Sequence, residues 1–280
     1  MTFRELHQGG CFVIPNPWDA GTAMYLKRLG FQALATTSSG LSFSKGLPDT
    51  DWAVPMEMTL ANISDIVRAT DLPVNADFES GFAHHPEGVA MNVARCVATG
   101  VAGLSIEDAT GNPQAPLYEL PLAIERIKAA RAAMDPSVLL TARTECYLTG
   151  HPEARGEALR RLTAFAEAGA DVLYAPGPRS REDIAAIVAA VAPKPVNILM
   201  SANTQLRVAD LAELGVRRIS LGSSLARTAW GAFIRAANEI AREGTFAAFD
   251  HAAPYAELNG FFRDELTRSR SVVAKPGDVS

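Results

Sequence analysis

The sequence predicts a single α/β domain of the (β/α)8 TIM-barrel type. About eight short runs, apolar on both faces as buried parallel strands are, alternate with amphipathic helical patterns. The chain has 280 residues and 48% of them are hydrophobic, which suits one large domain better than two small ones. A doubly wound open sheet is the alternative. It is disfavoured because no GxGxxG pattern follows the first strand, and Gly9 and Gly10 precede it.

The elements follow one repeating pattern: an amphipathic helix, a glycine that ends it, and a short apolar strand. Gly30 and Gly169 are two such stops, because glycine readily adopts the left-handed conformation that ends a helix. The predicted strands begin near Phe12, Ala33, Val74, Gly103, Val138, Val172, Val196 and Arg218. The predicted helices lie near residues 19–29, 58–70, 87–99, 120–134, 153–168, 180–192, 204–214 and 224–243.

The segment from Phe246 to Phe262 predicts an extra helix beyond the barrel. Tyr255, Leu258 and Phe261 recur there at helical spacing. An apolar helix needs a surface to cover, so it either packs on its own barrel or forms a subunit interface. We expect the barrel and this extension to occupy residues 1–264, and the polar residues 265–280 to form a flexible tail.

Composition excludes several classes of protein. The net charge of −5 provides no basic surface for nucleic acid, and no window approaches 18 uninterrupted apolar residues, so no membrane span is expected. The N-terminal residues 1–7 lack the apolar core of a signal peptide. Cys11, Cys96 and Cys146 form neither a disulfide framework nor a CxxC metal pair. We therefore expect a cytoplasmic protein.

Carboxylates follow two of the predicted strands. Asp77 and Glu79 end one strand and share a face, because side chains alternate with period two, and Glu107 ends the next. Carboxyl ends of parallel strands meet at one edge of a barrel, where chemistry is carried out. Such oxygens suit Mg²⁺, with waters filling the other positions. The alternative role for each carboxylate is helix N-capping, and Asp108, which points the other way, is the better candidate for it.

A third strand end carries Arg143 and, on the same face, Glu145. A guanidinium at a barrel mouth is suited to bind a carboxylate or phosphonate through two hydrogen bonds, or to form a structural ion pair with Glu145 or Glu107. The segment 37–42, a loop of small hydroxyl residues with Gly40, allows backbone N–H groups to approach an anion. Cys146 is expected to be a buried, inert thiol.

With these residues placed, the chain resembles the isocitrate lyase/phosphoenolpyruvate mutase superfamily, and within it members similar to phosphoenolpyruvate mutase and carboxyvinyl-carboxyphosphonate phosphorylmutase. The resemblance covers most of residues 10–245 and is specific only when its motifs are taken together. Its carriers are the segments 16–20, 37–40, 46–49, 75–82, 105–108 and 142–145. It implies a barrel whose last helix swaps between subunits of a dimer or tetramer, a Mg²⁺ cofactor, and a small 2-oxo acid or enolate-type ligand.

The resemblance also implies roles for individual residues. Asp77 corresponds to the direct Mg²⁺ ligand, and Asp49, Glu79 and Glu107 correspond to ligands through water. Glu79 stands where many members carry Asp. The backbone of Ser39, Gly40 and Leu41 corresponds to the cradle of the 2-oxo carboxylate, and Arg143 to the basic residue beside the substrate. The expected catalytic residues are Arg143, Glu107 and Asp49, and Asn112 matches an asparagine in the loop after the fourth strand.

That loop, residues 109–118, separates this chain from several members of the family. It lacks the Lys-Lys-Cys-Gly-His segment of enzymes that cleave isocitrate or methylisocitrate, and the Lys that mutases and phosphonopyruvate hydrolases place there. The options left open are decarboxylation of a β-oxo acid, C–C cleavage of another substituted malate, and P–C bond chemistry. All of these reactions pass through an enolate or its phosphoryl analogue. The alternative function is a non-catalytic 2-oxo acid binding protein that has lost its proton donor, and a purely structural scaffold is disfavoured.

Overall fold

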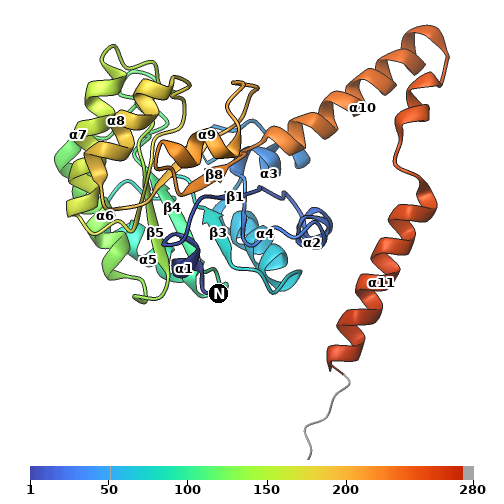
Figure 1. Ribbon diagram of the computed structural model, residues 1–280, viewed down its shortest axis with the longest axis horizontal. Coiled ribbons are helices and arrows are strands. Elements are labelled where there is room, and N and C mark those ends of the chain that lie inside the picture. The colour runs from blue at the N-terminus through green and yellow to red at the C-terminus, as the bar shows by residue number, and fades with distance from the viewer. Residues whose placement is uncertain (51, 274–280) are drawn as a thin grey trace, which may run out of the picture. The chain divides into compact units, whose positions relative to one another are not determined.

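Eight parallel strands form a nearly closed barrel in the computed structural model, which describes residues 1–50 and 52–273. The chain divides into two units, Met1–Ala226 and Arg227–Ser280, and the barrel lies in the first (Figure 1). Its strands are β1 (Phe12–Ile14), β2 (Leu34–Ala35), β3 (Val74–Asp77), β4 (Gly103–Glu107), β5 (Leu139–Arg143), β6 (Val172–Tyr174), β7 (Val196–Leu199) and β8 (Arg218–Ser220). The predicted fold class is therefore confirmed, and each strand begins within one residue of its predicted start.

The first strand pairs with the last, which distinguishes a barrel from an open sheet. Phe12 lies opposite Arg218 in the parallel ladder between β1 and β8, and every other neighbouring pair follows chain order. The seam lies between β1 and β2. There the Ala35 N–H donates to the Pro15 carbonyl (3.0 Å), and the buried Asn16 side chain donates to the Thr36 carbonyl (2.8 Å). These contacts close the barrel without a regular ladder.

Helices lie between the strands at the predicted places. They are α2 (Ala20–Arg28), α4 (Met56–Arg68), α5 (Pro86–Val97), α6 (Leu120–Ala132), α7 (Ala154–Glu167), α8 (Arg181–Val191), α9 (Val208–Glu213) and α10 (Ser224–Glu243). The main apolar core lies between the helices α4 to α9 and the outer faces of the strands, as the two-sided burial of β4 and β5 requires. None of the helices in the described part of the chain is both long and apolar enough to cross a bilayer.

A short helix, α1 (Phe3–Leu6), closes the amino-terminal end of the barrel. Its buried Phe3 and Leu6 join a small apolar cluster that includes Phe12 and Val172 from the strands. Above this floor lies a polar layer in which the buried Arg218 guanidinium donates to Asn197 Oδ1 (2.8 Å) and to Thr141 Oγ1 (3.0 Å). The interior is thus a filled core that supports the opposite, carboxyl-terminal edge of the strands.

Two segments differ from their predicted form. Residues predicted as a loop after the second strand form the helix α3 (Ser38–Ser44), whose N-cap Thr37 accepts the Gly40 N–H. The second unit contains most of α10, the 3-10 helix η1 (Ala247–His251) and α11 (Tyr255–Val273). The predicted extra helix is present, and it continues past residue 264, where the tail was expected to begin. Residues 274–280 of that tail lie outside the described residues, and its flexibility stays a prediction.

Candidate active site

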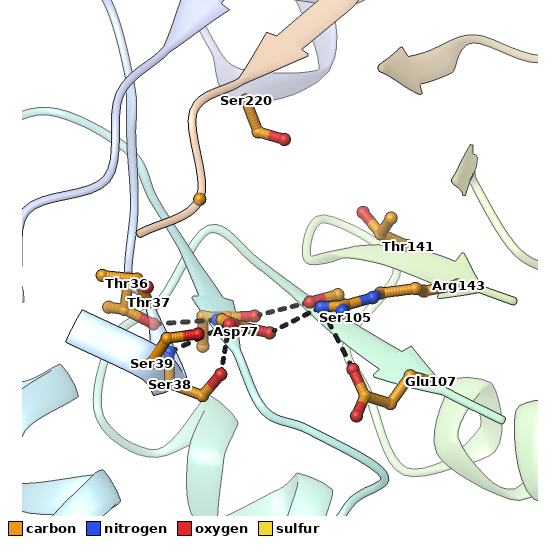
Figure 2. A network of polar contacts seen from close by, with 12 residues as sticks. Thr36, Thr37, Ser38, Ser39, Asp77, Ser105, Glu107, Thr141, Arg143 and Ser220 are labelled. Carbon is orange, nitrogen blue, oxygen red and sulfur yellow. Dashed lines mark hydrogen bonds and ion pairs between the residues drawn. The ribbon is translucent and has the colours of Figure 1, made fainter. Parts of the chain in front are cut away.

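Three charged side chains meet where β3, β4 and β5 end. Asp77, Glu107 and Arg143 are the last residues of these strands, and Glu107 pairs directly with Arg143 in the parallel register. In the parallel ladder between β3 and β4, Asp77 lies opposite Ser105. Adjacent parallel strands therefore bring these three side chains to one edge of the barrel, as the sequence predicts. Figure 2 shows Asp77 lying between Ser38 and Arg143, with Glu107 within reach of the same guanidinium.

Arg143 is bound by carboxylates from three directions. One of its terminal nitrogens lies 3.1 Å from Glu107 Oε2 and 3.5 Å from Asp77 Oδ1, and its Nε forms a short contact with Glu145. The side chain is largely buried, so these ion pairs are weakly screened by solvent. Burial opposes the charged form, but the Glu107 and Glu145 carboxylates outweigh it and raise the pKa of Arg143. The structural ion pairs considered from the sequence are thus present, and they involve both glutamates.

The second oxygen of Asp77 is held by the start of α3. Asp77 Oδ2 accepts hydrogen bonds from the Ser38 N–H and from the Ser38 hydroxyl, both at 3.0 Å. The Asp77 N–H donates to Thr36 Oγ1 at 2.8 Å. These contacts fix the carboxylate between α3 and Arg143. Ser38 and Thr36 were not among the predicted site residues, although both lie in the segment that follows the second strand.

Glu79 and Asp49 add two further carboxylates. Burial raises the pKa of the Glu79 carboxyl to about 8, and the negative charges of Asp77 and Asp49 add to the shift. Asp49 lies in the loop after α3, where its Oδ2 accepts the Ser39 hydroxyl at 2.5 Å. Burial likewise raises the pKa of Glu107 well above its ordinary value, against the opposing effect of Arg143. Burial thus opposes ionisation of Glu79 and Glu107, and a nearby positive charge favours it.

The donor set fits a hard divalent cation bound mainly through water. Asp77, Glu107 and Glu145 are oxygen donors in contact with Arg143, and Glu79 is near enough to Asp77 and Asp49 for their charges to act on it, so the formal charge of the cluster is negative. Within residues 1–50 and 52–273, no three His, Cys, Asp or Glu side chains are close enough to form a complete metal cage. A magnesium ion with one direct carboxylate ligand and several waters does not need such a cage.

In the predicted anion cradle, the backbone N–H groups of Gly40 and Leu41 already have acceptors. The Gly40 N–H donates to the Thr37 hydroxyl at 3.2 Å, and the Leu41 N–H donates to the Thr37 carbonyl within α3. A ligand carboxylate would have to replace the hydroxyl as the acceptor for Gly40.

Asn112 is exposed, and its Oδ1 accepts the Gln114 N–H at 3.0 Å. Among the described residues, no hydrogen bond joins Asn112 to the carboxylate cluster.

Tyr174 and Asp108 lie beside the site. Tyr174 was not among the predicted site residues, whereas Asp108 was expected to point away from the cluster and to cap a helix. The Tyr174 ring lies with its centroid 5.4 Å from the guanidinium carbon of Arg143, and burial raises its pKa to about 12. It ends β6, so its position at a predicted strand end was the available signal. Asp108 faces away from the cluster and binds Arg161 (3.0 Å) and the Glu145 N–H (2.9 Å). It orients the end of β5 rather than capping a helix.

Cys146 follows this strand end but has the properties of a buried thiol. It is fully buried, and burial raises the pKa of its thiol to about 11. Its sulfur lies 3.0 Å from Thr144 Oγ1. A thiol with this pKa carries almost no thiolate at neutral pH, so it is a poor nucleophile.

Known proteins are similar to this chain in sequence and in fold. The chain is 33% identical over 273 residues to the uncharacterised protein Rv1998c of Mycobacterium tuberculosis strain H37Rv, covering 96% of this chain and 99% of that one. Other relatives are named 2-methylisocitrate lyase, 2,3-dimethylmalate lyase and oxaloacetate decarboxylase. A solved structure from Burkholderia cenocepacia J2315, whose name says only lyase/mutase, is 47% identical and has a TM-score of 0.89, with 93% of this chain and 94% of that one covered.

A second solved structure carries ligands of the expected chemistry. It is a phosphonopyruvate hydrolase in complex with oxalate and Mg²⁺, 27% identical with a TM-score of 0.82, and the match covers 97% of this chain and all of that one. The family model described as phosphoenolpyruvate phosphomutase matches residues 3–241. The match spans the whole barrel, including the strand ends that carry Asp77, Glu107 and Arg143. The chain therefore belongs to the phosphoenolpyruvate phosphomutase family, within the isocitrate lyase/phosphoenolpyruvate mutase superfamily.

Proposed function

We propose that this protein is a Mg²⁺-dependent enzyme that breaks or rearranges the C–C or P–C bond at C3 of a small 2-oxo acid or its phosphono analogue. The observation that carries the proposal is the meeting of Asp77, Glu107 and Arg143 at the ends of three adjacent strands. The names of its relatives, which include lyases, a decarboxylase and a phosphonopyruvate hydrolase, support the same class of substrate.

We assign Asp77 as the direct ligand of Mg²⁺, and Asp49, Glu79 and Glu107 as partners of its bound waters. When bound, Mg²⁺ would supply positive charge to the substrate oxygen that becomes negative as the bond at C3 breaks. Ser38 and Arg143 contact the two oxygens of Asp77. Ser38 therefore orients the carboxylate, because its N–H and its hydroxyl both donate to the same oxygen.

The remaining residues bind and orient the substrate. Arg143 would bind its carboxylate or phosphonate through its planar guanidinium, which Tyr174 and Glu145 hold in place. The backbone of Ser39, Gly40 and Leu41 would receive the 2-oxo carboxylate in place of the Thr37 hydroxyl.

The loop after β4 favours one group of reactions. It lacks the cysteine of the isocitrate-type lyases and the lysine of the mutases. We therefore place decarboxylation of a β-oxo acid, or cleavage of another substituted malate, ahead of methylisocitrate cleavage and P–C chemistry. Asn112 is the loop residue that we assign to the substrate.

A Mg²⁺-dependent turnover screen tests this proposal. Oxaloacetate, phosphonopyruvate, substituted malates and methylisocitrate are each incubated with the protein, and pyruvate release is measured; phosphoenolpyruvate formation needs its own assay. We expect Asp77→Asn to abolish turnover, and Asp171→Asn, which alters a carboxylate bound by Arg4 and Arg131 away from the cluster, to retain it. Binding without any product would favour a non-catalytic 2-oxo acid binding protein. Full activity of Asp77→Asn at saturating Mg²⁺ would contradict the metal assignment.

We also infer that the protein is a homo-oligomer, a dimer or tetramer, in the cytoplasm. In the second unit, large apolar side chains are exposed on α10, on η1 and just before η1, among them Phe233 (61% exposed), Phe249 (54%) and Phe246 (61%). Apolar surface on this scale calls for a covering partner, and we assign that role to a second copy of the chain, with its C-terminal helix exchanged. The three cysteines are free thiols, which supports a reducing compartment.

A further inference from the structure

The turn that follows β3 has a backbone that is unfavourable by itself. Glu79 (φ 48°) and Phe82 (φ 52°) adopt left-handed conformations that residues with a side chain seldom occupy, and Gly81 (φ 80°) lies between them. The surrounding structure must therefore hold the turn in place. What holds it matters for the site, because this turn carries the Glu79 carboxylate.

A buried arginine from α6 binds three main-chain carbonyls of this turn. Arg126 is only 1% exposed, and its guanidinium donates to the carbonyls of Ala83 (2.6 Å) and His84 (2.5 Å), and through a short contact to that of Ser80. Three main-chain carbonyls are thus gathered by one rigid cation. A guanidinium is suited to this, because its five donors have a fixed planar arrangement.

The other carbonyls of the turn are bound as well. Asn92 of α5 donates from Nδ2 to the carbonyls of Gly81 (2.9 Å) and Phe82 (3.1 Å). The Glu79 carbonyl accepts the Glu107 N–H at 3.0 Å, which links the backbones of the two carboxylates directly. The Phe78 carbonyl accepts the Gly81 N–H at 2.9 Å. Every carbonyl in residues 78–84 therefore has a donor.

Arg126 also contacts the base of the loop after β4. Its guanidinium carbon lies 3.9 Å from the centroid of the Tyr118 ring. Tyr118 closes that loop, because its N–H donates to the Asp108 carbonyl at 2.9 Å. Its hydroxyl lies 2.7 Å from Nδ1 of His84, which belongs to the turn after β3. One side chain thus touches both loops that frame the carboxylate cluster.

We propose that Arg126 is a positioning residue of the site. It holds the turn that carries Glu79 and the base of the loop after β4, and so fixes the position of one relative to the other. It is not one of the residues assigned above to the metal or the substrate. Its effect on cation binding rests on the function proposed above, whereas its effect on the two loops does not. Asn92 assists it on the turn alone.

A purely structural arginine on the same helix provides a matched control. Arg131, in the last turn of α6, donates to the carbonyls of Val138 (3.0 Å) and Asp135 (2.7 Å) and pairs with Asp171 (2.9 Å). These partners lie at the amino-terminal end of β5, away from the carboxylate cluster. Arg126→Met and Arg131→Met each remove a guanidinium that binds carbonyls, so both should lower the melting temperature.

Hydrogen–deuterium exchange measured by mass spectrometry on the full-length protein distinguishes the two. Arg126→Met should speed exchange in peptides covering residues 78–85 and 109–118, and Arg131→Met should leave these peptides at the wild-type rate. Asn92→Ala should speed exchange in the first peptide only. If Arg126→Met does not fold, Arg126→Lys is measured instead. It keeps the charge but loses the planar guanidinium, so we expect a smaller acceleration of exchange in the same two peptides. Wild-type exchange in a folded Arg126 variant, or equal acceleration in Arg131→Met, overturns the proposal.

Calorimetric titration with Mn²⁺ alone then measures how each substitution changes the affinity of the site for a divalent cation. Arg126→Met should weaken Mn²⁺ binding about tenfold, the usual scale for residues that orient metal-binding groups, and Arg131→Met should leave it unchanged. Faster exchange with wild-type Mn²⁺ affinity would overturn the positioning role. If the wild-type protein binds no Mn²⁺, the proposed function fails, and the exchange experiment alone decides whether Arg126 holds the two loops.

Discussion

His7 is a histidine that folding keeps neutral. It lies in the barrel floor, 6% exposed, between the rings of Phe3 (4.8 Å) and Phe12 (5.0 Å), and its Nδ1 lies 2.8 Å from the Phe3 carbonyl. Its Nε2 is buried without a hydrogen-bond partner among the described residues. Burial, together with the charge of Arg218, lowers the pKa of His7 from 6.5 to about 3.

This depressed pKa predicts an acid-sensitive fold. Below about pH 6.5 the unfolded chain binds a proton at His7, whereas the folded protein binds it only near pH 3. The free energy of unfolding therefore falls as the pH falls from about 6.5 to about 3. Between pH 7 and pH 4 we expect wild type to lose roughly 3 kcal/mol of unfolding free energy more than His7→Phe, because each pKa unit corresponds to about 1.4 kcal/mol. Urea unfolding across this range measures it. His85→Phe, at an exposed position, is the control, and parallel curves for wild type and His7→Phe would refute the prediction.

At the level of elements, two glycines differ in the space that surrounds them. A Cβ on Gly103, the first residue of β4, would lie 2.9 Å from the Leu139 carbonyl oxygen and 2.9 Å from the Phe3 ring. The carbonyl belongs to the neighbouring strand and cannot move without disturbing the ladder. A Cβ on Gly156 of α7 would meet nothing within 4 Å.

The pair predicts opposite changes in stability. Gly103→Ala should lower the free energy of unfolding by about 2 kcal/mol, because overpacking forces the backbone to shift. Gly156→Ala should raise it by up to about 1 kcal/mol, because alanine favours the helix more than glycine does. Thermal or chemical unfolding of both variants beside wild type measures the changes. A neutral Gly103→Ala would show that the floor of the barrel is looser than these distances indicate.

The order of the elements could be predicted because each strand is bounded locally. A helix, a glycine stop and an apolar run such as 169–174 are all contained in one short stretch of sequence. The helix α3 could not be predicted in this way, since its segment is rich in serine and contains Gly40, both poor helix formers. Its first turn is stabilised by the neighbouring Thr37 and also by Asp77, which lies 39 residues away from Ser38 in the sequence.

The gathering of charges at the site could likewise be predicted only in part. Strand ends alone indicate that Asp77, Glu107 and Arg143 are neighbours, because parallel strands share one edge. Which partner each side chain takes depends on its rotamer and on residues far away in sequence. The contacts of Ser38 with Asp77 and of Tyr174 with Arg143 are of this kind. The catalytic and metal-binding roles of these residues stay predictions.

At the scale of the whole molecule, the exposed apolar surface of the second unit is the feature that a single chain leaves unexplained. Phe233 and Ile234 of α10 are 61% and 50% exposed, and Tyr255 of α11 is 82% exposed. Burial of a large apolar side chain contributes about 1.5–3 kcal/mol, so a few such residues covered by a second copy would stabilise an assembly substantially. Met91 of α5 is 70% exposed and belongs to the first unit.

We therefore expect wild type to sediment as a dimer or tetramer at micromolar concentration, and Phe233→Asp to shift the equilibrium toward monomers. The substitution removes apolar contact and would bury a charge, so the dissociation constant should rise tenfold or more, since about 1.4 kcal/mol suffices for each tenfold change. Met91→Asp should leave the assembly intact. Sedimentation velocity over a dilution series measures all three proteins, with circular dichroism to confirm that each is folded. A monomeric wild type, or an unchanged Phe233→Asp oligomer, would show that the second unit covers its apolar face in another way.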